Sequence, residues 1–145
     1  MADPFDLQRF VDAQDAGGTY ARALAELRAG RKQSHWMWFV FPQIEGLGFS
    51  AMSRRYAISG LAEAAAYLAH PVLGPRLREC VAAVNAVKGR SARELMGSPD
   101  DMKLRSCLTL FARAAPDAEA FKDALSRYFA GEEDPATVSR VCARG

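Results

Sequence analysis

Apolar residues along the chain recur every three or four positions, in segments that glycine and proline interrupt. This spacing places the apolar side chains on one face of a helix and is typical of amphipathic helices packed around a core. In the first part of the chain it predicts a short helix over residues 7–14, capped by Asp6, and a second helix that begins at Thr19 and ends at Gly30.

Helix-start and helix-stop signals divide the second half of the chain in the same way. The predicted helices there cover residues 61–70, 73–89, 117–131 and 135–141, with a further helix between Ser98 and Pro116 and a short helical turn after Ser91. In the helix over residues 73–89, we expect Gly74-Pro75 to delay the start of the regular part. Ser91 with Glu94 has the spacing of a capping box, and Ser98 repeats that signal with Pro99 at the first helical position. Asp134 is the predicted cap of the last helix.

Residues 30–56 depart from this regular pattern. The stretch contains both tryptophans, one of the two histidines, three phenylalanines and four Lys or Arg residues. Pro42 disfavours helical geometry at the residue before it, so we predict that residues 37–42 are extended or irregular. Ser50 is then expected to cap a helical turn.

Length and composition indicate one folded domain. The 145 residues match an ordinary domain, half of them are apolar or aromatic, and a quarter are charged. Together with the helical pattern, this predicts an all-α protein: a single compact multihelical domain over residues 1–145, with an irregular aromatic-rich segment near residues 36–48.

The formal net charge of +2 is small, whereas nucleic-acid-binding domains usually carry a clustered basic surplus, so the composition argues against a nucleic-acid partner.

The cysteines and the N-terminal residues indicate the cellular compartment in which the protein is expected. The three cysteines are far apart and lack metal-binding or redox spacing, so buried or spare thiols are the simpler interpretation, and we expect no metal and no cofactor. The N-terminus lacks a signal-peptide pattern, and no apolar run reaches the roughly 20 residues of a membrane span. We therefore expect a cytoplasmic protein without a membrane partner, and a homo-oligomer is compatible with this interpretation.

The residue types between Gly30 and Tyr56 suit an anionic ligand that contains a ring. Arginine offers a planar fork for phosphate or carboxylate, lysine offers a point charge, and aromatic faces can stack on a base or sugar. The candidate ligand-binding residues are Arg31, Lys32, Trp36, Trp38, Gln43, Arg54, Tyr56 and, from a predicted helix start further along the chain, Lys103. The alternative is that both tryptophans belong to the core and the basic residues form a solvated rim.

Two residues of the same stretch are candidates for proton transfer. His35 can act as an acid or a base near neutral pH, and Glu45 lies in a glycine-flanked loop from which it could reach a ligand. The alternative for His35 is a structural or helix-capping role. Asp101, beside Lys103, could add a carboxylate, although its position at a predicted helix start already explains an acidic residue there.

Four blocks of sequence carry a family resemblance: SHWMWFVFPQIEGLG at residues 34–48, SRRYAI at 53–58, HPVLGPRLREC at 70–80 and DDMKLRSCLTLF at 100–111. With these blocks the chain resembles, over almost its whole length, the bacterial and fungal family known as domain of unknown function 1810. The resemblance implies a compact all-helical domain of about this size with no agreed activity, so it brings no established catalytic residues. In size, helical character and tryptophan-rich polar motifs the chain is also similar, more weakly, to ADP-ribose-processing helical domains that cleave N-glycosidic bonds.

Two functional hypotheses follow from these observations. In the first, the protein binds a phosphorylated or nucleotide-like small molecule, such as an ADP-ribose derivative, and in an enzymatic version also hydrolyses it. In the second, it is a non-enzymatic protein-interaction or dimerisation module that uses the aromatic stretch as its interface. The first hypothesis requires a cleft at Lys32, His35 or Tyr56. A third reading, RNA binding through stacked aromatic residues, would require a continuous basic groove.

Overall fold

Helix α8 (Asp100–Ala114) is the central element of the protein. In the computed structural model, which describes residues 3–115 and 117–144, it contacts α5 (Leu61–Ala69), α7 (Ala92–Met96), α9 (Glu119–Phe129) and α10 (Pro135–Arg144). Every side chain from residue 106 to residue 112 is buried, as expected of a helix that is covered on all sides. The predicted stop signal for this helix, Pro116, lies outside the described residues.

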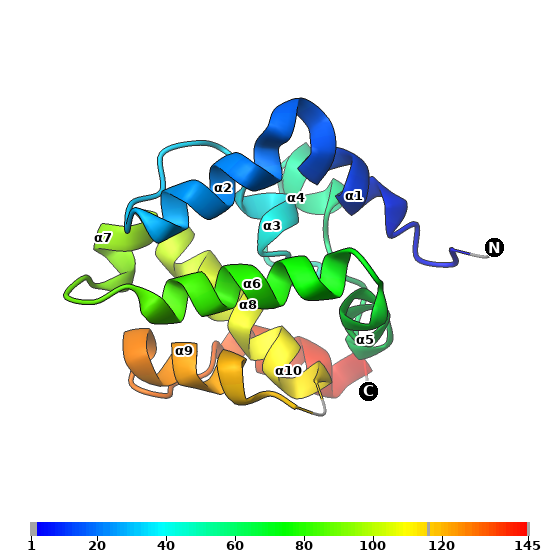
Figure 1. The fold of residues 1–145 in the computed structure, drawn as a ribbon. Helices are drawn as coiled ribbons and strands as arrows, with labels where there is room; N and C mark the ends of the chain where they lie inside the picture. Colours follow the sequence, from blue (N-terminus) through cyan, green and yellow to red (C-terminus); the bar gives the residue numbers. More distant parts are fainter. Residues whose placement is uncertain (1–2, 116, 145) are drawn as a thin grey trace.

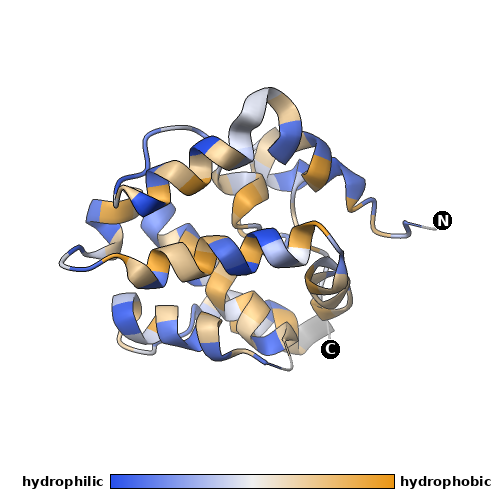
Figure 2. Ribbon diagram, viewed as in Figure 1, coloured by the Kyte–Doolittle hydropathy of each residue, from blue (hydrophilic) through white to orange (hydrophobic). Residues whose placement is uncertain are grey.

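The other elements complete the domain. They are α1 (Gln8–Asp15), the 3-10 turn η1 (Ala16–Gly18), α2 (Thr19–Arg28), α3 (Met37–Val40), α4 (Ala51–Arg55) and α6 (Leu73–Ala86). Helix α6 lies between α2 and α9 and contacts both (Figure 1). The longer helices carry hydrophilic and hydrophobic residues in alternation along their length, as amphipathic helices around a core do (Figure 2).

The all-α fold class predicted from the sequence is confirmed. The described residues contain helices and no β-strand, and one isolated parallel bridge joins Ile44 to Ile58. A continuous hydrophobic core links the helices, and Tyr67, Phe111 and Phe121 are among its largest fully buried side chains. The protein is therefore a single helical domain.

Three of the predicted helix caps are confirmed. Ser50 caps α4, and Ser91 with Glu94 forms the reciprocal capping box at the start of α7. At the start of α10, the carboxylate of Asp134 accepts a hydrogen bond from the backbone N–H of Thr137 at 3.0 Å. These caps depend on contacts between residues close in sequence, which is why their spacing reveals them.

Two other predicted caps are wrong. Asp6 does not cap α1, because the carboxylate of Asp3 accepts a hydrogen bond from the N–H of Leu7 at 2.8 Å and takes that role. Ser98 does not cap α8, because Pro99 occupies the cap position and makes no side-chain hydrogen bond there.

The irregular segment begins later than predicted. Residues 37–42 were expected to be extended or irregular, but Met37–Val40 form one turn of helix, α3. The N–H of Val40 donates to the carbonyl of Trp36, and the N–H of Phe41 donates to the carbonyl of Met37, both at 3.1 Å. Proline restricts the residue before it, so Pro42 ends the helix at Phe41 without disturbing the preceding turn.

Helix α6 begins at Leu73, so the prediction that Gly74-Pro75 delays its regular part is wrong. Proline is tolerated in the first turn of a helix, where its missing N–H is not needed. Gly74 is buried, and a Cβ added to it would overlap the backbone carbonyl of Leu68 at the end of α5. Glycine at this position therefore allows the two helices to approach each other closely.

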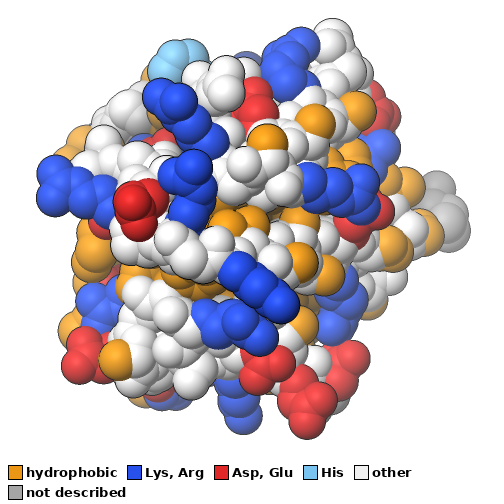
Figure 3. Space-filling model, turned by 60° about the vertical axis from the view of Figure 1, so that its left-hand side comes forward, with side chains coloured by type: hydrophobic (Ala, Val, Ile, Leu, Met, Phe, Trp, Pro, Cys, Tyr) orange, Lys and Arg blue, Asp and Glu red, His pale blue; other side chains and the backbone are white. Residues whose placement is uncertain are grey.

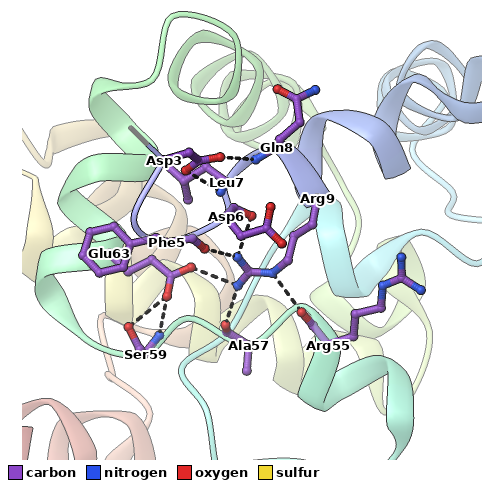
Figure 4. A network of polar contacts seen from close by, with 10 residues as sticks. All are labelled: Asp3, Phe5, Asp6, Leu7, Gln8, Arg9, Arg55, Ala57, Ser59 and Glu63. Atoms are coloured by element: carbon purple, nitrogen blue, oxygen red, sulfur yellow. Dashed lines mark hydrogen bonds and ion pairs between the residues drawn. The ribbon is translucent and has the colours of Figure 1, made fainter. Parts of the chain in front are cut away.

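Arg9 joins α1 to the segment between α4 and α5 (Figure 4). Its guanidinium donates to the carbonyls of Arg55 and Ala57 and to the carboxylate of Glu63, each at 2.9 Å, and to two carbonyls of the segment that precedes α1. The same carboxylate accepts from the N–H and hydroxyl of Ser59, both at 2.9 Å. Figure 4 shows the carbonyls and the Glu63 carboxylate around one guanidinium, with Ser59 bound to that carboxylate, so distant parts of the chain share a single polar network.

Candidate functional site

The loop that connects α2 to α3 is held by the carboxylate of Glu26 on α2. Its Oε1 accepts from the N–H of Gln33 at 2.7 Å, the N–H of Ser34 at 2.9 Å and the indole N–H of Trp36 at 2.9 Å. Its Oε2 accepts from the hydroxyl of Ser34. Burial opposes ionisation of this carboxyl, but these donors outweigh that effect and lower the pKa of Glu26 to about 2.

Lys32 connects the same loop to α7 and α8. Its backbone N–H donates to the carbonyl of Leu95 at 2.7 Å, and its ammonium donates to the carbonyl of Ser34 at 2.6 Å. The ammonium also lies 2.8 Å from Oδ2 of Asp100 and 4.9 Å from the ring centre of Trp36. The side chain is only 6% exposed, so Lys32 acts first as a structural cation that fixes the loop against the start of α8.

Trp38 and Lys103 form a second pair, which is more accessible. Trp38, on α3, is half-buried, and the ammonium of Lys103 lies 5.2 Å from the centre of its ring. The same ammonium is 3.4 Å from Oδ1 of Asp100, and the Lys103 side chain is 28% exposed. Asp100 thus stands between two lysines and contacts Lys32 at the shorter distance.

Three cavities lie next to one another around these residues. One, the Gln43 cavity, has a volume of about 230 Å³ and is lined by Trp38, Gln43, Ile44, Tyr56, Lys103 and the loop that includes Gly46 and Phe49. The second, the His35 cavity, measures about 280 Å³ and is lined by Lys32, His35, Trp38, Pro99, Asp100 and Lys103. The third, the Arg54 cavity, measures about 340 Å³ and is lined by Glu45, Gly46, Phe49, Ser53, Arg54 and Ala57. Trp38 and Lys103 line the first two cavities, whereas Gly46, Phe49 and Ser53 line the first and third.

The comparisons with known proteins place the chain in a family. A family model described as "Protein of unknown function (DUF1810)" matches residues 4–141. The chain belongs to this family. The crystal structure of the conserved hypothetical protein Rv1873 from Mycobacterium tuberculosis, at 1.38 Å, is similar to it with a TM-score of 0.94 and 55% sequence identity, over 97% of this chain and 99% of that one. No curated protein gave a significant match.

The structure groups most of the sequence-predicted residues around the three cavities. Lys32, His35, Trp38, Gln43, Tyr56 and Lys103 line the Gln43 cavity or the His35 cavity, and Glu45 and Arg54 line the Arg54 cavity. The two residues considered for proton transfer, His35 and Glu45, therefore line different cavities. Arg31 is exposed and lines none of the three.

Trp36 lies in the core and does not form a wall of the site. Its side chain is fully buried, and its indole N–H is bonded to Glu26. The interpretation that Trp36 stacks on a ligand ring is therefore corrected: of the two tryptophans, only Trp38 reaches these cavities.

Three residues of the site were missed in the sequence. Asp100 pairs with both lysines, although the sequence singled out Asp101 next to it. Phe49 is 81% exposed and lines two cavities. Arg140, on α10, packs against Gly46. The spacing of Asp100 and Lys103 at one helical turn could have indicated their pairing, whereas no local pattern connects Arg140 with a loop so far away in the chain.

The surface charges, the buried thiols and the search for metal ligands bear on three further functions: RNA binding, catalysis by a cysteine and metal binding. On the face shown in Figure 3, Lys and Arg side chains are spread among hydrophobic, uncharged and acidic ones and do not form the continuous groove that RNA binding would require. Cys80 and Cys107 are buried, and burial raises the pKa of the Cys80 thiol to about 12, so neither thiol is poised as a nucleophile. Among the described residues, no cluster of His, Cys, Asp and Glu could hold a metal ion, and no helix is long and apolar enough to cross a membrane.

Replacing Glu26 by glutamine is expected to lower the free energy of unfolding by about 1 kcal/mol at pH 7, because partial solvent exposure weakens the charge-assisted hydrogen bonds. The ordinary pKa of 4.5 falls to about 2 on folding, so the ionised carboxylate stabilises the folded state. That contribution is fully present above about pH 4.5 and is lost as the pH falls through about 2. Urea unfolding followed by circular dichroism between pH 2 and pH 7 measures it.

The matched control for this prediction is Glu119→Gln, at an exposed position at the start of α9. The control should retain the acid-dependent loss of stability between pH 4.5 and pH 2, whereas Glu26→Gln should lose part of it. Identical pH profiles for Glu26→Gln and the wild type would contradict the assignment of Glu26.

Proposed function

We propose that this protein binds a small anionic molecule that contains a ring, of the phosphorylated or nucleotide-like kind, across the Gln43 and His35 cavities. The observation that carries this proposal is the pair formed by Trp38 and Lys103, which both cavities share. Trp38 offers a ring face to a ligand, and Lys103 offers an ammonium beside that face. An aromatic wall next to a cation is the combination that a phosphorylated ring compound requires.

The charges of the site favour an anion. Lys32 and Lys103 share the single carboxylate of Asp100, so the three groups together carry one unit of positive charge. Asp100 contacts Lys32 at 2.8 Å and Lys103 only at 3.4 Å, which leaves the Lys103 ammonium the more available of the two. Lys103, rather than Lys32 or Arg31, is therefore the residue that we assign to the anionic group.

The size of the cavities supports a ligand that extends over both. Their volumes of about 230 and 280 Å³ are each slightly below the roughly 300–1,000 Å³ of typical small-molecule sites. Together they fall within that range. In the Gln43 cavity, the Gln43 amide can donate and accept hydrogen bonds at a polar edge of the ring, while Tyr56 and Trp38 supply apolar walls.

Hydrolysis is a narrower proposal that would rest on His35 alone. His35 is exposed and shares its cavity with Lys103, whereas Glu45 lines a cavity on the other side of the Gly46–Phe49 loop. An acid and a base at those two positions would not flank one bond. If bond cleavage follows binding, His35→Gln should lower the rate of product formation and leave ligand affinity unchanged.

The test of binding uses Lys103→Gln. Thermal shift and tryptophan fluorescence are measured with adenosine 5′-monophosphate and ADP-ribose on the wild type, on Lys103→Gln and on Lys88→Gln, a matched control at an exposed position between α6 and α7. We expect the wild type and the control to be stabilised by ligand and Lys103→Gln to bind about tenfold more weakly, since a hydrogen bond to a charged group contributes about 1.5–3 kcal/mol.

The same samples distinguish ligand binding from the second candidate function, a protein-interaction module. Phe49 is 81% exposed and Met52 is 36% exposed, and exposed apolar side chains in one segment also suit a protein-interaction surface. A stable dimer in sedimentation velocity, with no thermal response to either nucleotide, would favour that interaction module and overturn the binding proposal. Equal affinity of Lys103→Gln and Lys88→Gln would overturn the assignment of Lys103.

A further inference from the structure

The loop from Gly46 to Phe49 is a wall between the Gln43 cavity and the Arg54 cavity. It is held at both ends. Before it, the N–H of Glu45 donates to the carbonyl of Ile58 at 2.8 Å, and after it Ser50 caps α4. A ligand that extends from the Gln43 cavity towards the Arg54 cavity would therefore pass a short and well-positioned segment of chain.

Arg140 reaches this loop from α10. A Cβ added to Gly46 would overlap the Arg140 guanidinium, and the backbone of Gly46 has a φ of 93°, which other residues rarely adopt. The backbone conformation therefore favours glycine here, whereas the guanidinium, at the end of a flexible side chain, could move aside from a Cβ. The contact places the guanidinium beside a residue that lines both cavities.

Arg140 differs from the other half-buried arginines in having no acceptor among the residues that the structure describes. Those arginines each donate to a carboxylate or carbonyl at 2.8 or 2.9 Å: Arg9 to Glu63, Arg76 to Asp15, Arg78 to Asp117 and Arg105 to the carbonyls of Glu132 and Glu133. Within the described part of the chain, no hydrogen bond or ion pair involves the Arg140 side chain. Guanidinium groups bind carboxylate and phosphate through paired N–H donors, so this one is set up for an anion from outside the chain.

Arg54 is a second guanidinium near this loop, because it lines the Arg54 cavity together with Gly46. It lines the Arg54 cavity from α4, and its side chain makes no hydrogen bond or ion pair with the described residues. Glu45, which lines this cavity too, is not without a partner. Arg54 in this cavity and Arg140 beside Gly46 are two cations near one carboxylate, that of Glu45, which favours an anion near the loop, as Lys103 does in the Gln43 cavity.

We infer that Arg140, together with Arg54, binds a second anionic group of the ligand, so that the ligand class is a ring compound with two separate phosphate or carboxylate groups. This inference rests on the proposed function. The ring occupies the Gln43 cavity, one anionic group lies near Lys103, and the other lies beyond the Gly46–Phe49 loop at Arg140. Phe49, which lines both cavities and is mostly exposed, covers the ligand where it passes between them.

The experiment compares adenosine 5′-monophosphate with adenosine 3′,5′-bisphosphate by isothermal titration. The wild type is expected to bind the bisphosphate at least about tenfold more tightly than the monophosphate. Arg140→Gln should lose this preference while keeping its affinity for the monophosphate within about twofold. Arg127→Gln, at an exposed position on α9, is the matched control and should behave as the wild type does.

Arg140→Lys tests whether the preference for the bisphosphate depends on the positive charge of Arg140 alone or also on the planar shape of its guanidinium. It keeps the charge without the planar fork, so we expect an intermediate preference for the bisphosphate. Equal affinity of the wild type for the two nucleotides, or an equal loss of both in Arg140→Gln, would overturn the role of Arg140 and leave the Lys103 site standing. Failure of the wild type to bind either nucleotide would overturn the proposed function and this inference together.

Discussion

Replacing Arg9 by methionine is expected to lower the free energy of unfolding by about 3–5 kcal/mol, the usual cost of removing one partner of a buried ion pair. The Arg9 side chain is 15% exposed and that of Glu63 only 4%, so the carboxylate would remain buried without its cation. The carbonyls of Arg55 and Ala57 would lose a donor as well. Urea denaturation followed by circular dichroism gives the change directly.

Two further variants show whether the loss of stability in Arg9→Met comes from the broken ion pair between Arg9 and Glu63. Arg9→Met combined with Glu63→Leu should recover part of the stability, because it leaves no unpaired carboxylate in the interior. Arg22→Met is the matched control: Arg22 is exposed, donates to the carbonyl of Gly17 at 3.0 Å, and should cost less than about 0.5 kcal/mol. An Arg9→Met protein as stable as the Arg22→Met protein would contradict the role assigned to the network.

Gly74→Ala is expected to destabilise the protein by about 2 kcal/mol. The added Cβ would overlap a backbone carbonyl, that of Leu68, which cannot turn aside as a side chain can, so we expect an overpacking cost at the upper end of its usual range, about 3 kcal/mol. The higher helix propensity of alanine offsets about 1 kcal/mol of this cost and does not reverse its sign. Thermal and urea unfolding would measure the net effect.

Gly60→Ala is the control for this prediction. Gly60 has a φ of 168°, an extended conformation open to any residue, and a Cβ there would meet no atom within 4 Å. The change should cost less than about 1 kcal/mol, mainly through a poorer residue at the cap of α5. A Gly74→Ala protein more stable than the wild type would show that α5 and α6 can separate at little cost, contrary to the close contact described above.

These stability predictions concern the framework that positions the candidate site. Arg9 joins α1 to the segment just after α4, and α4 carries Arg54 at the edge of the third cavity. Glu26 and Lys32 hold the loop that precedes α3, which carries Trp38. Variants of Arg9 and Glu26 should therefore be checked for folding before any change in ligand affinity is attributed to the cavities.

The helical domain was largely predictable because helices depend on contacts between residues close in the sequence. The capping box of Ser91 with Glu94 and the cap at Asp134 involve residues three positions apart, and both are confirmed. Two predictions were wrong because proline disturbs a helix less than its reputation suggests. Helix α6 includes Gly74-Pro75, since proline is tolerated in the first turn, and Pro42 left one helical turn intact before it.

Sequence alone determined the family, the all-α class and the stretch that contributes most of the candidate site. It could not separate Trp36 from Trp38, because both are aromatic and no regular period orients the loop before α3. Their roles were decided by a carboxylate on α2, which binds the indole of Trp36 inside the core, and by Lys103 on α8, which lies over the ring of Trp38. Only the tertiary structure brought Arg140 to Gly46, since packing of α10 against α8 joins segments that are far apart in the chain. Local periodicity records which face of a helix is buried, but the partner on that face depends on how the whole chain packs.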